Sequence, residues 1–362
     1  MHKRLAFSII TGIVLSGAML YFAFRNVPFD DLRHYLMSIN YWWVLPGVAI
    51  ILASFFLRAF RWQILLNSER IRFWQALHPL MIGFMLNCVF PGRIGEIVRP
   101  LLIKKKEAYP FTRGLATVAA ERLLDTILLV CLLAVVLATV PIDPGHSMHF
   151  GSYSLNRRTL VAASHGLLKI CLLLIAVVVL VSVRASRRLL MAMLDRIPTL
   201  LAFGGQAFSL RIERMISRPL KAMVEHVAGG FAVLRRPGMM LACVLLSVVI
   251  WLLVALSYFV ILQGAPGIRL SFAEITAVMV IVCFFIALPS IPGYWGIWEA
   301  GGVFAMTLFG VSAKEAAGFT LANHAVQLFP IIVAGLISAL ITGVNLWQVA
   351  LKPDPGEMPA GI

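Results

Sequence analysis

Acidic and basic side chains lie inside the apolar stretches of this 362-residue chain. Glu121 and Asp125 are four residues apart, so both carboxylates share one face of a helix, with Arg122 turned away from that face. A charge in the hydrocarbon layer of a membrane costs a few kcal/mol and needs a partner or a water-filled cavity. We therefore expect both carboxylates to face the protein interior and to pair with Arg93 or Arg99.

The pair Pro91-Gly92 interrupts the apolar segment that precedes these carboxylates. Proline ends a helix and glycine permits a sharp turn, so a new helix begins near Arg93 with unpaired N–H groups and the positive end of its dipole. This end can bind an anion, and Arg93 and Arg99 would add charge-assisted hydrogen bonds to a phosphate. Asn87 would cap the helix or bind the same anion. In the alternative interpretation, Arg93 and Glu96 only neutralise each other and lock the turn.

A second break lies at Pro289-Ser290-Ile291-Pro292-Gly293. The pattern PG-x-x-G-E at 91–96 is matched by PG-x-x-G-x-x-E at 292–299, which ends on Glu299. About thirty positions later each half has a polar intramembrane pair, Glu121-Arg122 in the first and Asn323-His324 in the second. His324 would relay protons or bind a headgroup, or would simply make a hydrogen-bonded helix contact.

The composition indicates an all-α polytopic membrane protein. Hydrophobic residues make up 60% of the chain and charged residues 13%, against about 25% charged residues in a soluble domain. The mean hydropathy is +0.92. The net charge of +15 fits cytoplasmic loops that rest against anionic headgroups better than it fits nucleic-acid binding.

The positions of the basic residues decide which apolar runs cross the membrane. Basic clusters flank the run 73–90 on both sides, and a run whose two ends stay in the cytoplasm must enter the bilayer and return. We interpret 73–103 and 272–310 as re-entrant helical hairpins, which leaves about six full spans. The full spans are expected at 5–24, 42–66, 112–140, 160–183, 239–262 and 318–346. Arg58 and Arg61 end the second of these and are expected to reach the cytoplasmic surface, with phosphate binding as the alternative.

The order span, hairpin, span occurs twice, at about 42–140 and about 239–346, with opposite orientations. This predicts an inverted-topology repeat, in which broken helices build a site near the bilayer midplane. A single transmembrane domain is expected over 1–352, followed by a tail at 353–362. The segment of about 184–236 contains ten Lys or Arg residues and is expected to be cytoplasmic and amphipathic. We expect a multi-pass protein of a prokaryotic plasma membrane with both termini in the cytoplasm.

Motifs for nucleotide binding and hydrolysis are missing from the sequence. We find no GxxxxGK[ST], no GxGxxG after a strand, no HExxH and no GxSxG. The five cysteines lie in apolar runs without CxxC spacing. We therefore expect no metal and no cofactor, and a protein that transports rather than an enzyme.

The stretch Asn87-Cys-Val-Phe-Pro-Gly-Arg-Ile-Gly-Glu-Ile-Val-Arg99, with Glu121-Arg122-x-x-Asp125 and the second break leading to Glu299, resembles a known family. It is similar to the flippase-like transmembrane domain of lysylphosphatidylglycerol synthases, which also occurs alone. The resemblance covers nearly the whole chain. It implies that a phospholipid or a polyprenyl-linked or glycosylated lipid is carried between leaflets. The positions that it implicates are Arg93, Glu96, Arg99, Glu121, Arg122, Asp125 and Glu299. No aminoacyl-transferase domain follows in this sequence, so lysine transfer is not assigned.

Three functions are compatible with these features. The first is a lipid flippase, because two hairpins that meet near the midplane supply a polar groove for a charged headgroup. The second is a membrane-embedded lipid-modifying transferase or its accessory subunit. The third is a proton-coupled transporter of a small anion that uses Glu121, Asp125 and His324. Expected partners are membrane lipids with an anionic or phosphate-bearing headgroup, a lipid-synthesis enzyme and a second copy of the chain, but not nucleic acid.

Overall fold

The computed structural model describes residues 13–139 apart from 15, 22 and 26, then 148–150, 153–155, single positions between 161 and 180, 184–200, parts of 210–225, and 236–346 apart from 289 and 290. These residues are almost entirely helical. The helices are α2 (Phe29–Ser38), α3 (Val44–Leu66), α4 (Phe73–Val89), α5 (Gly95–Glu107), α6 (Phe111–Thr139), α8 (Arg184–Leu200), α11 (Pro237–Leu262), α12 (Phe272–Phe285), α13 (Ile297–Thr307) and α14 (Ala313–Thr342). Two short antiparallel strands, β1 (Met148–Phe150) and β2 (Tyr153–Leu155), were not predicted.

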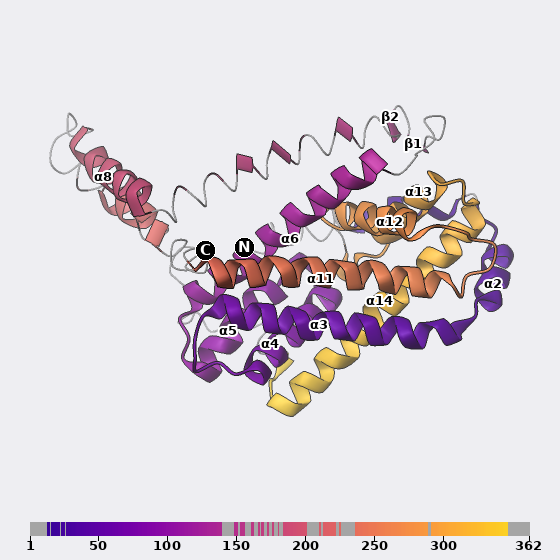
Figure 1. Cartoon of the computed structure of the whole chain (residues 1–362), viewed down its shortest axis with the longest axis horizontal. Coiled ribbons are helices and arrows are strands. Elements are labelled where there is room, and N and C mark those ends of the chain that lie inside the picture. Colours follow the sequence, from indigo (N-terminus) through magenta and orange to yellow (C-terminus); the bar gives the residue numbers. More distant parts are fainter. Residues whose placement is uncertain are drawn as a thin grey trace.

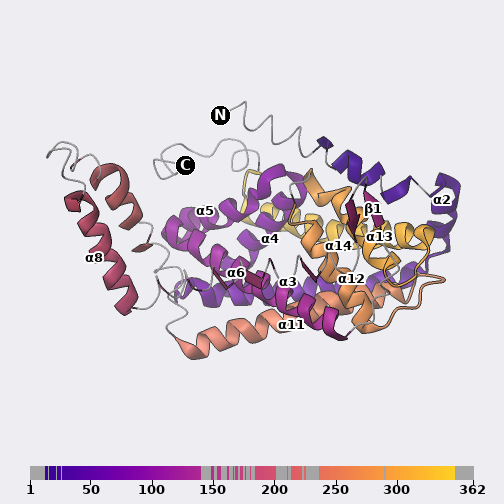
Figure 2. The same cartoon turned by 90° about the horizontal axis from the view of Figure 1, so that it is seen from above.

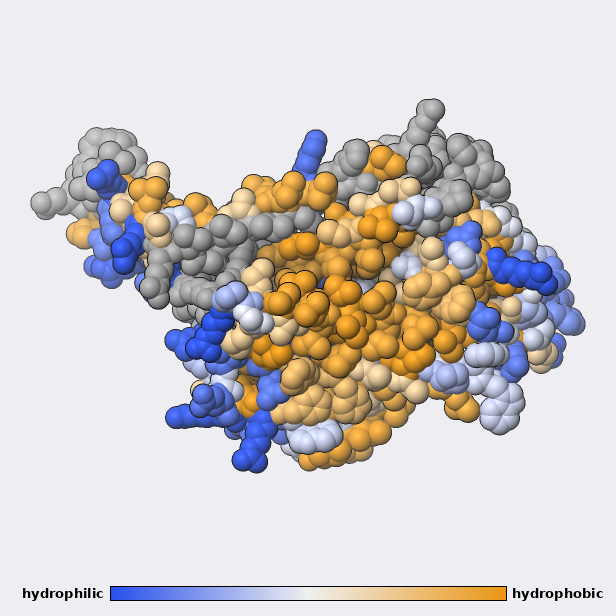
Figure 3. All heavy atoms as spheres, in the orientation of Figure 1, coloured by the Kyte–Doolittle hydropathy of each residue, from blue (hydrophilic) through white to orange (hydrophobic). Residues whose placement is uncertain are grey.

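Three of the described helical stretches are long and apolar enough to cross a membrane, namely Tyr41–Leu66, α11 and α14. The helix α6 has 29 residues, which is about 43 Å at 1.5 Å per residue, but it carries the buried charges. Figure 3 shows a broad apolar belt with hydrophilic residues at both ends. Exposed leucines such as Leu45, Leu241 and Leu340 contribute to the apolar surface. The chain is therefore a multi-pass membrane protein.

Several predictions fall on residues outside this description. Most of the expected spans 5–24 and 160–183, the tail 353–362 and the break residue Pro289 lie there. Of the predicted segment 184–236, the described part is mainly α8. Figures 1 and 2 show α8 to one side of the helical bundle.

The helices α3 and α11 lie side by side and run in opposite directions (Figure 1). Arg236, before α11, donates to Oδ1 of Asn67, after α3, at 3.2 Å. At the other end, the Asn40 backbone N–H donates to the Gly264 carbonyl at 2.8 Å. Since each helix leads directly into a helix–break–helix unit, the two units begin at opposite ends of the bundle.

Each helix–break–helix unit is a hairpin of two short packed helices, α4 with α5 and α12 with α13. The breaks have the same backbone conformation. Gly92 has φ 79° and Gly293 has φ 73°, and the next residues, Arg93 and Tyr294, have φ 53° and 61°. Glycine adopts this left-handed region without strain, whereas other residues do so rarely. The two Pro–Gly breaks therefore form the same kind of turn.

The two halves pack on each other reciprocally. The helix α4 of the first half packs on α14 of the second, and α12 of the second half packs on α6 of the first. The α4–α14 contact is close, since a Cβ on Gly335 would lie 2.3 Å from Met85 Cβ. The hairpin ends also touch, because Arg93 donates to the Ile286 carbonyl at 2.9 Å. Thus two hairpins that begin at opposite ends of the bundle touch at their ends.

The first hairpin depends on two glycines. A Cβ added to Gly95 would lie 1.8 Å from the Gly83 carbonyl oxygen, which is backbone and cannot move aside. We expect Gly95→Ala to lower the free energy of unfolding by about 1–3 kcal/mol, the usual range for overpacking. Thermal unfolding in detergent micelles measures the change. Gly238→Ala is the matched control, since a Cβ there meets nothing within 4 Å. Equal melting temperatures for the two variants would contradict the tight α4–α5 contact.

Candidate functional site

Five ionisable side chains from three helices meet in a buried cluster, hereafter the arginine cluster. They are Arg58 and Arg61 on α3, Arg99 on α5, and Glu121 and Asp125 on α6. Arg61 and Glu121 have no exposed surface, and Arg58, the most exposed of the five, retains 7%. The spacings i,i+3 on α3 and i,i+4 on α6 place each pair on one helix face, so the two faces oppose each other.

The strongest ion pair of the cluster joins α3 to α6. Arg61 donates twice to Asp125, from Nη1 to Oδ1 at 2.6 Å and from Nη2 to Oδ2 at 3.1 Å. The helix α11 contributes two further contacts: Arg61 Nη1 donates to Ser247 Oγ at 2.6 Å, and Trp251 Nε1 donates to Asp125 Oδ1 at 3.2 Å. The bidentate geometry and the added hydrogen bonds compensate for the loss of water around both charges.

Glu121 joins α6 to the first hairpin. Its Oε2 accepts a hydrogen bond from Arg99 Nη2 at 2.8 Å, as the expected pairing with Arg99 requires. Its Oε1 accepts one from Arg122 Nη2 at 2.7 Å. The expectation that Arg122 turns away was wrong, because its long side chain folds back along the helix and also reaches Asp125 Oδ2 at 3.6 Å and Glu96 Oε1 at 3.8 Å.

Arg58 and Arg61 do not reach the surface, contrary to the expectation from the sequence. The helix α3 continues for five residues past Arg61 to Leu66, so both guanidinium groups sit within the bundle and turn to the carboxylates of α6. Their i,i+3 spacing inside an apolar helix was the signal that could have indicated this. No comparable signal marked Ser247 or Trp251 on α11.

An aromatic ring from α4 borders the arginine cluster. The Phe84 ring centre lies 5.9 Å from the guanidinium carbon of Arg58 and 5.6 Å from those of Arg99 and Arg122. Trp62 lies closer to Arg99, at 4.2 Å. A ring face attracts a cation, so Phe84 and Trp62 partly replace the solvation of these groups. The sequence alone did not identify either residue.

The arginine cluster has more positive than negative charge. Four guanidinium groups, with Arg122 included, face three carboxylates when Glu96 is counted. The Nε–H group of each of the four arginines is buried and has no hydrogen-bond partner among the described residues. Buried donors of this kind are costly when unpaired. The site therefore has both the charge and the free donors to accept an anion.

The first break is held by Asn87 and Arg93. Asn87 Oδ1 accepts a hydrogen bond from the Gly95 backbone N–H at 2.8 Å and so caps α5. Arg93 donates to the second hairpin and not to the carboxylates. The N-terminus of α5 is thus engaged by the protein itself, and the free donors lie deeper, in the arginine cluster. Glu96 retains 27% of its side-chain exposure and lies at the accessible edge of this cluster, beside Arg122.

The second half has a less charged counterpart of the arginine cluster. Arg99–Glu121 joins α5 to α6, and Glu299–His324 joins α13 to α14, with Glu299 Oε1 2.5 Å from His324 Nδ1. Arg61–Asp125 joins α3 to α6, whereas α11 is joined to α14 through a hydrogen bond from Gln327 Nε2 to Ser257 Oγ at 2.9 Å. The contacts around the two hairpins therefore differ in chemistry.

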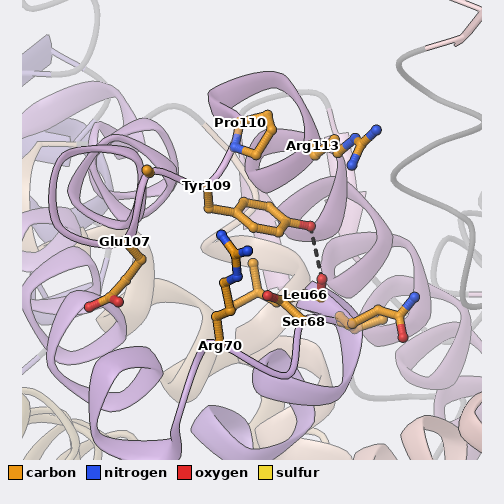
Figure 4. A pocket seen from close by; sticks show the side chains of 10 residues that line it. Leu66, Ser68, Arg70, Glu107, Tyr109, Pro110 and Arg113 are labelled. Atoms are coloured by element: carbon orange, nitrogen blue, oxygen red, sulfur yellow. Dashed lines mark hydrogen bonds between the residues drawn. The ribbon is translucent and has the colours of Figure 1, made fainter.

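A surface cavity of about 470 Å³ lies where α3 ends and the α5–α6 loop begins (Figure 4). Tyr109 crosses it and donates from its hydroxyl to the Leu66 carbonyl at 2.8 Å. Burial raises the pKa of Tyr109, which keeps the hydroxyl protonated and able to donate. Arg70 and Arg113 line the cavity with the polar residues Asn67 and Ser68. Among the described residues, no group of three or more His, Cys, Asp or Glu is placed to hold a metal ion.

A double-mutant cycle tests the Arg61–Asp125 pair. Arg61→Met leaves Asp125 with only its longer contacts to Arg58 and Arg122, and Asp125→Leu leaves Arg61 with only its contact to Glu121 at 3.5 Å. We expect each substitution to lower the free energy of unfolding by at most about 3–5 kcal/mol. The double variant should lose much less than the sum of the two. The same substitutions in the exposed pair Lys314–Asp31, 3.5 Å apart, should couple by at most about 1 kcal/mol. Additive losses at Arg61 and Asp125, measured by denaturant unfolding in micelles, would contradict the described pairing.

Comparison with known proteins gives one family and one distant relative. The chain is 27% identical over 330 residues to the glycosyltransferase AglD of Haloferax volcanii. That similarity covers 84% of this chain and 49% of AglD, so the chain spans about half the length of this relative. No solved structure matches the chain significantly. The family profile of the lysylphosphatidylglycerol synthase transmembrane region matches residues 9–335, which contain both hairpins and the arginine cluster. The chain belongs to this family, that of the lysylphosphatidylglycerol synthase transmembrane region.

Proposed function

We propose that this protein moves a lipid with a phosphate-bearing headgroup between the two leaflets of its membrane. The observation that carries the proposal is the arginine cluster together with Arg122, with its excess of positive charge and four buried Nε–H donors that have no hydrogen-bond partner among the described residues. A lipid phosphate brings one negative charge and several acceptor oxygens. Guanidinium groups bind such oxygens in fixed, charge-assisted geometry.

The position of the cluster suits a headgroup that enters while its tails remain in lipid. Arg122 and Glu96 keep 32% and 27% of their side-chain exposure, whereas Arg61, Arg99 and Glu121 are buried behind them. A phosphate that reaches Arg122 would take the place of Glu96, whose contact with Arg122 at 3.8 Å is longer than a hydrogen bond. Acyl chains would stay against the exposed apolar surface of the bundle, since only the headgroup needs polar surroundings.

Alternating access follows from the two hairpins. We propose that both are re-entrant, dip into the bilayer from opposite faces, and form an inverted-topology repeat of the kind found in many secondary transporters. Their contact through Arg93 and Ile286 closes the route between the two sides. Because Glu121 ties the first hairpin to α6 through Arg99, a phosphate that competes for Arg99 would loosen this hairpin. Arg99 then links phosphate binding to the opening of the first hairpin.

The surface cavity beside Tyr109 is proposed as the point where the headgroup first binds. Arg70 and Arg113 outweigh the single carboxylate of Glu107 in this cavity, which lies about one and a half helical turns along α3 from Arg61. The basic residues Lys104, Lys105 and Lys106 at the end of α5 favour a cytoplasmic position for this end of the bundle. We propose a prokaryotic plasma membrane as the location, with both termini on the cytoplasmic side.

A second candidate function is that of an accessory unit which presents a lipid to a transferase. The match to about half of a glycosyltransferase favours it. The two functions differ in their product, because a transferase unit yields a chemically altered lipid and a transporter yields the same lipid in the other leaflet. Mass spectrometry of lipids recovered from proteoliposomes, with and without candidate sugar donors, separates them.

Transfer of a fluorescent phosphatidylglycerol between leaflets of proteoliposomes, followed by quenching from outside, tests the proposal. Arg122→Gln removes the accessible guanidinium, and we expect it to slow transfer at least about tenfold. A tenfold slower rate corresponds to an activation free energy that is higher by roughly 1.4 kcal/mol. Arg218→Gln is the control, because Arg218 pairs with Glu213 at an exposed position outside both hairpins. A phosphate-free glycosyl diacylglycerol should be transferred poorly by the unaltered protein. Equal rates for Arg122→Gln and Arg218→Gln would overturn the assignment of the site.

A further inference from the structure

The second break is held by a buried histidine. His324 has no exposed surface, and its two ring nitrogens have separate partners. Nε2 lies 2.8 Å from the Gly293 carbonyl oxygen, and Nδ1 lies 2.5 Å from Glu299 Oε1. The other carboxylate oxygen of Glu299 accepts from the Gly296 backbone N–H at 2.6 Å. This one side chain therefore connects α14 to both the turn and the returning arm of the second hairpin.

The hydrogen bonds of His324 require a bound proton. A carbonyl oxygen only accepts, so Nε2 must donate to Gly293. At 2.5 Å the Nδ1–Oε1 contact also needs a hydrogen, since two lone pairs would repel at this distance. Either imidazolium faces carboxylate or neutral imidazole faces a carboxylic acid. In both descriptions the pair Glu299–His324 holds one proton more than an ionised glutamate and a neutral histidine would hold together.

The surroundings of the pair favour this proton-bound state. Trp295 and Trp298 each lie with their ring centre 4.5 Å from the His324 ring, and Trp298 is stacked on it at 3°. Aromatic faces attract a cationic ring. The elements around the pair carry further titratable or charged groups, namely His78 and Cys88 on α4, Cys243 and Tyr258 on α11, Glu274 and Cys283 on α12, Lys314 and Glu315 on α14, and Arg93 and Tyr294 at the two breaks. The tyrosines and cysteines are neutral near pH 7, and Arg93 is directed to the Ile286 carbonyl. Glu274 and Glu315 bind the serines that cap their own helices, Lys314 pairs with Asp31, and His78 contacts Ser338.

We infer that the pair Glu299–His324 is a proton-binding site whose release of its proton opens the second hairpin. Without the proton, Nδ1 and Oε1 repel, the imidazole turns, and the hydrogen bond from Nε2 to Gly293 is lost. Gly293 is packed against the end of α4, where a Cβ would lie 3.3 Å from the Cys88 carbonyl oxygen. Release of the turn at Gly293 therefore weakens the contact between the two hairpins. The proton leaves to water on the side to which the second hairpin opens.

This inference rests on the proposed lipid transport and supplies its energy source. If one proton is bound and released in each cycle, a proton gradient drives headgroup transfer through the second hairpin while the first binds the phosphate. Glu299→Gln tests the step sharply, because the glutamine amide can donate to Nδ1 of a neutral histidine. The variant keeps both hydrogen bonds of His324 without the exchangeable proton and imitates the closed state.

The experiment measures leaflet transfer of fluorescent phosphatidylglycerol in proteoliposomes, with and without an imposed pH gradient, together with the internal pH. We expect the gradient to accelerate transfer by the unaltered protein at least about fivefold, a modest coupling, and a protonophore to abolish the acceleration. Glu299→Gln should show neither acceleration nor proton movement linked to transfer. Arg218→Gln should respond as the unaltered protein does.

A readout independent of transport separates the two proposals. Nitrogen-15 NMR of histidine-labelled protein, compared with His324→Gln, should assign to His324 an imidazole that gains or loses a proton when the pH of the sample is changed. Transfer that is equally fast with and without the gradient, with no such titration, would overturn the proton site and leave lipid transport standing. If the unaltered protein transfers no lipid, the proposed function fails, while the NMR titration still decides whether the proton site exists.

Discussion

Two carboxylates on α6 hold the surrounding helices in place, because neither can remain charged inside an apolar bundle without a partner. Asp125 binds α3 through Arg61 and α11 through Trp251, and Glu121 binds the first hairpin through Arg99. Removing either acid leaves a guanidinium group buried without compensation. The same interactions that make the structure stable therefore make its conformation sensitive to any anion that competes for the arginines.

The two helix–break–helix units are each fixed by a buried polar contact, and the chemistry of that contact differs between them. In both, the returning arm of a hairpin is tied to the long helix that follows it. In the first half the joint is an ion pair, Arg99–Glu121, within a cluster with excess positive charge. In the second it is the 2.5 Å contact between Glu299 and His324. In our proposal the first hairpin responds to a phosphate and the second to a proton, and their ends touch through Arg93.

Sequence reasoning predicted the elements better than the side-chain directions. Pro–Gly pairs located both hairpin turns, because proline and glycine restrict the backbone in a way that does not depend on tertiary contacts. The i,i+4 spacing placed Glu121 and Asp125 on one inward face. The sequence did not predict that Arg61 points inward or that Arg122 folds back to Glu121. Long flexible side chains can turn to a nearby carboxylate even when their helix position faces elsewhere. No local pattern marked Ser247, because its partner Arg61 lies on α3, more than a hundred residues away in sequence.

An electron cryo-microscopy structure of the protein in a phosphatidylglycerol nanodisc tests the central claim most directly, because it shows both the bilayer and any bound headgroup. The account predicts that both hairpins lie within the bilayer and that a lipid phosphate lies within hydrogen-bonding distance of Arg99 and Arg122, with Glu96 displaced. A structure in which the arginines keep their described pairs with Glu121, Asp125 and Glu96, with lipid bound only to the outer surface, would contradict it.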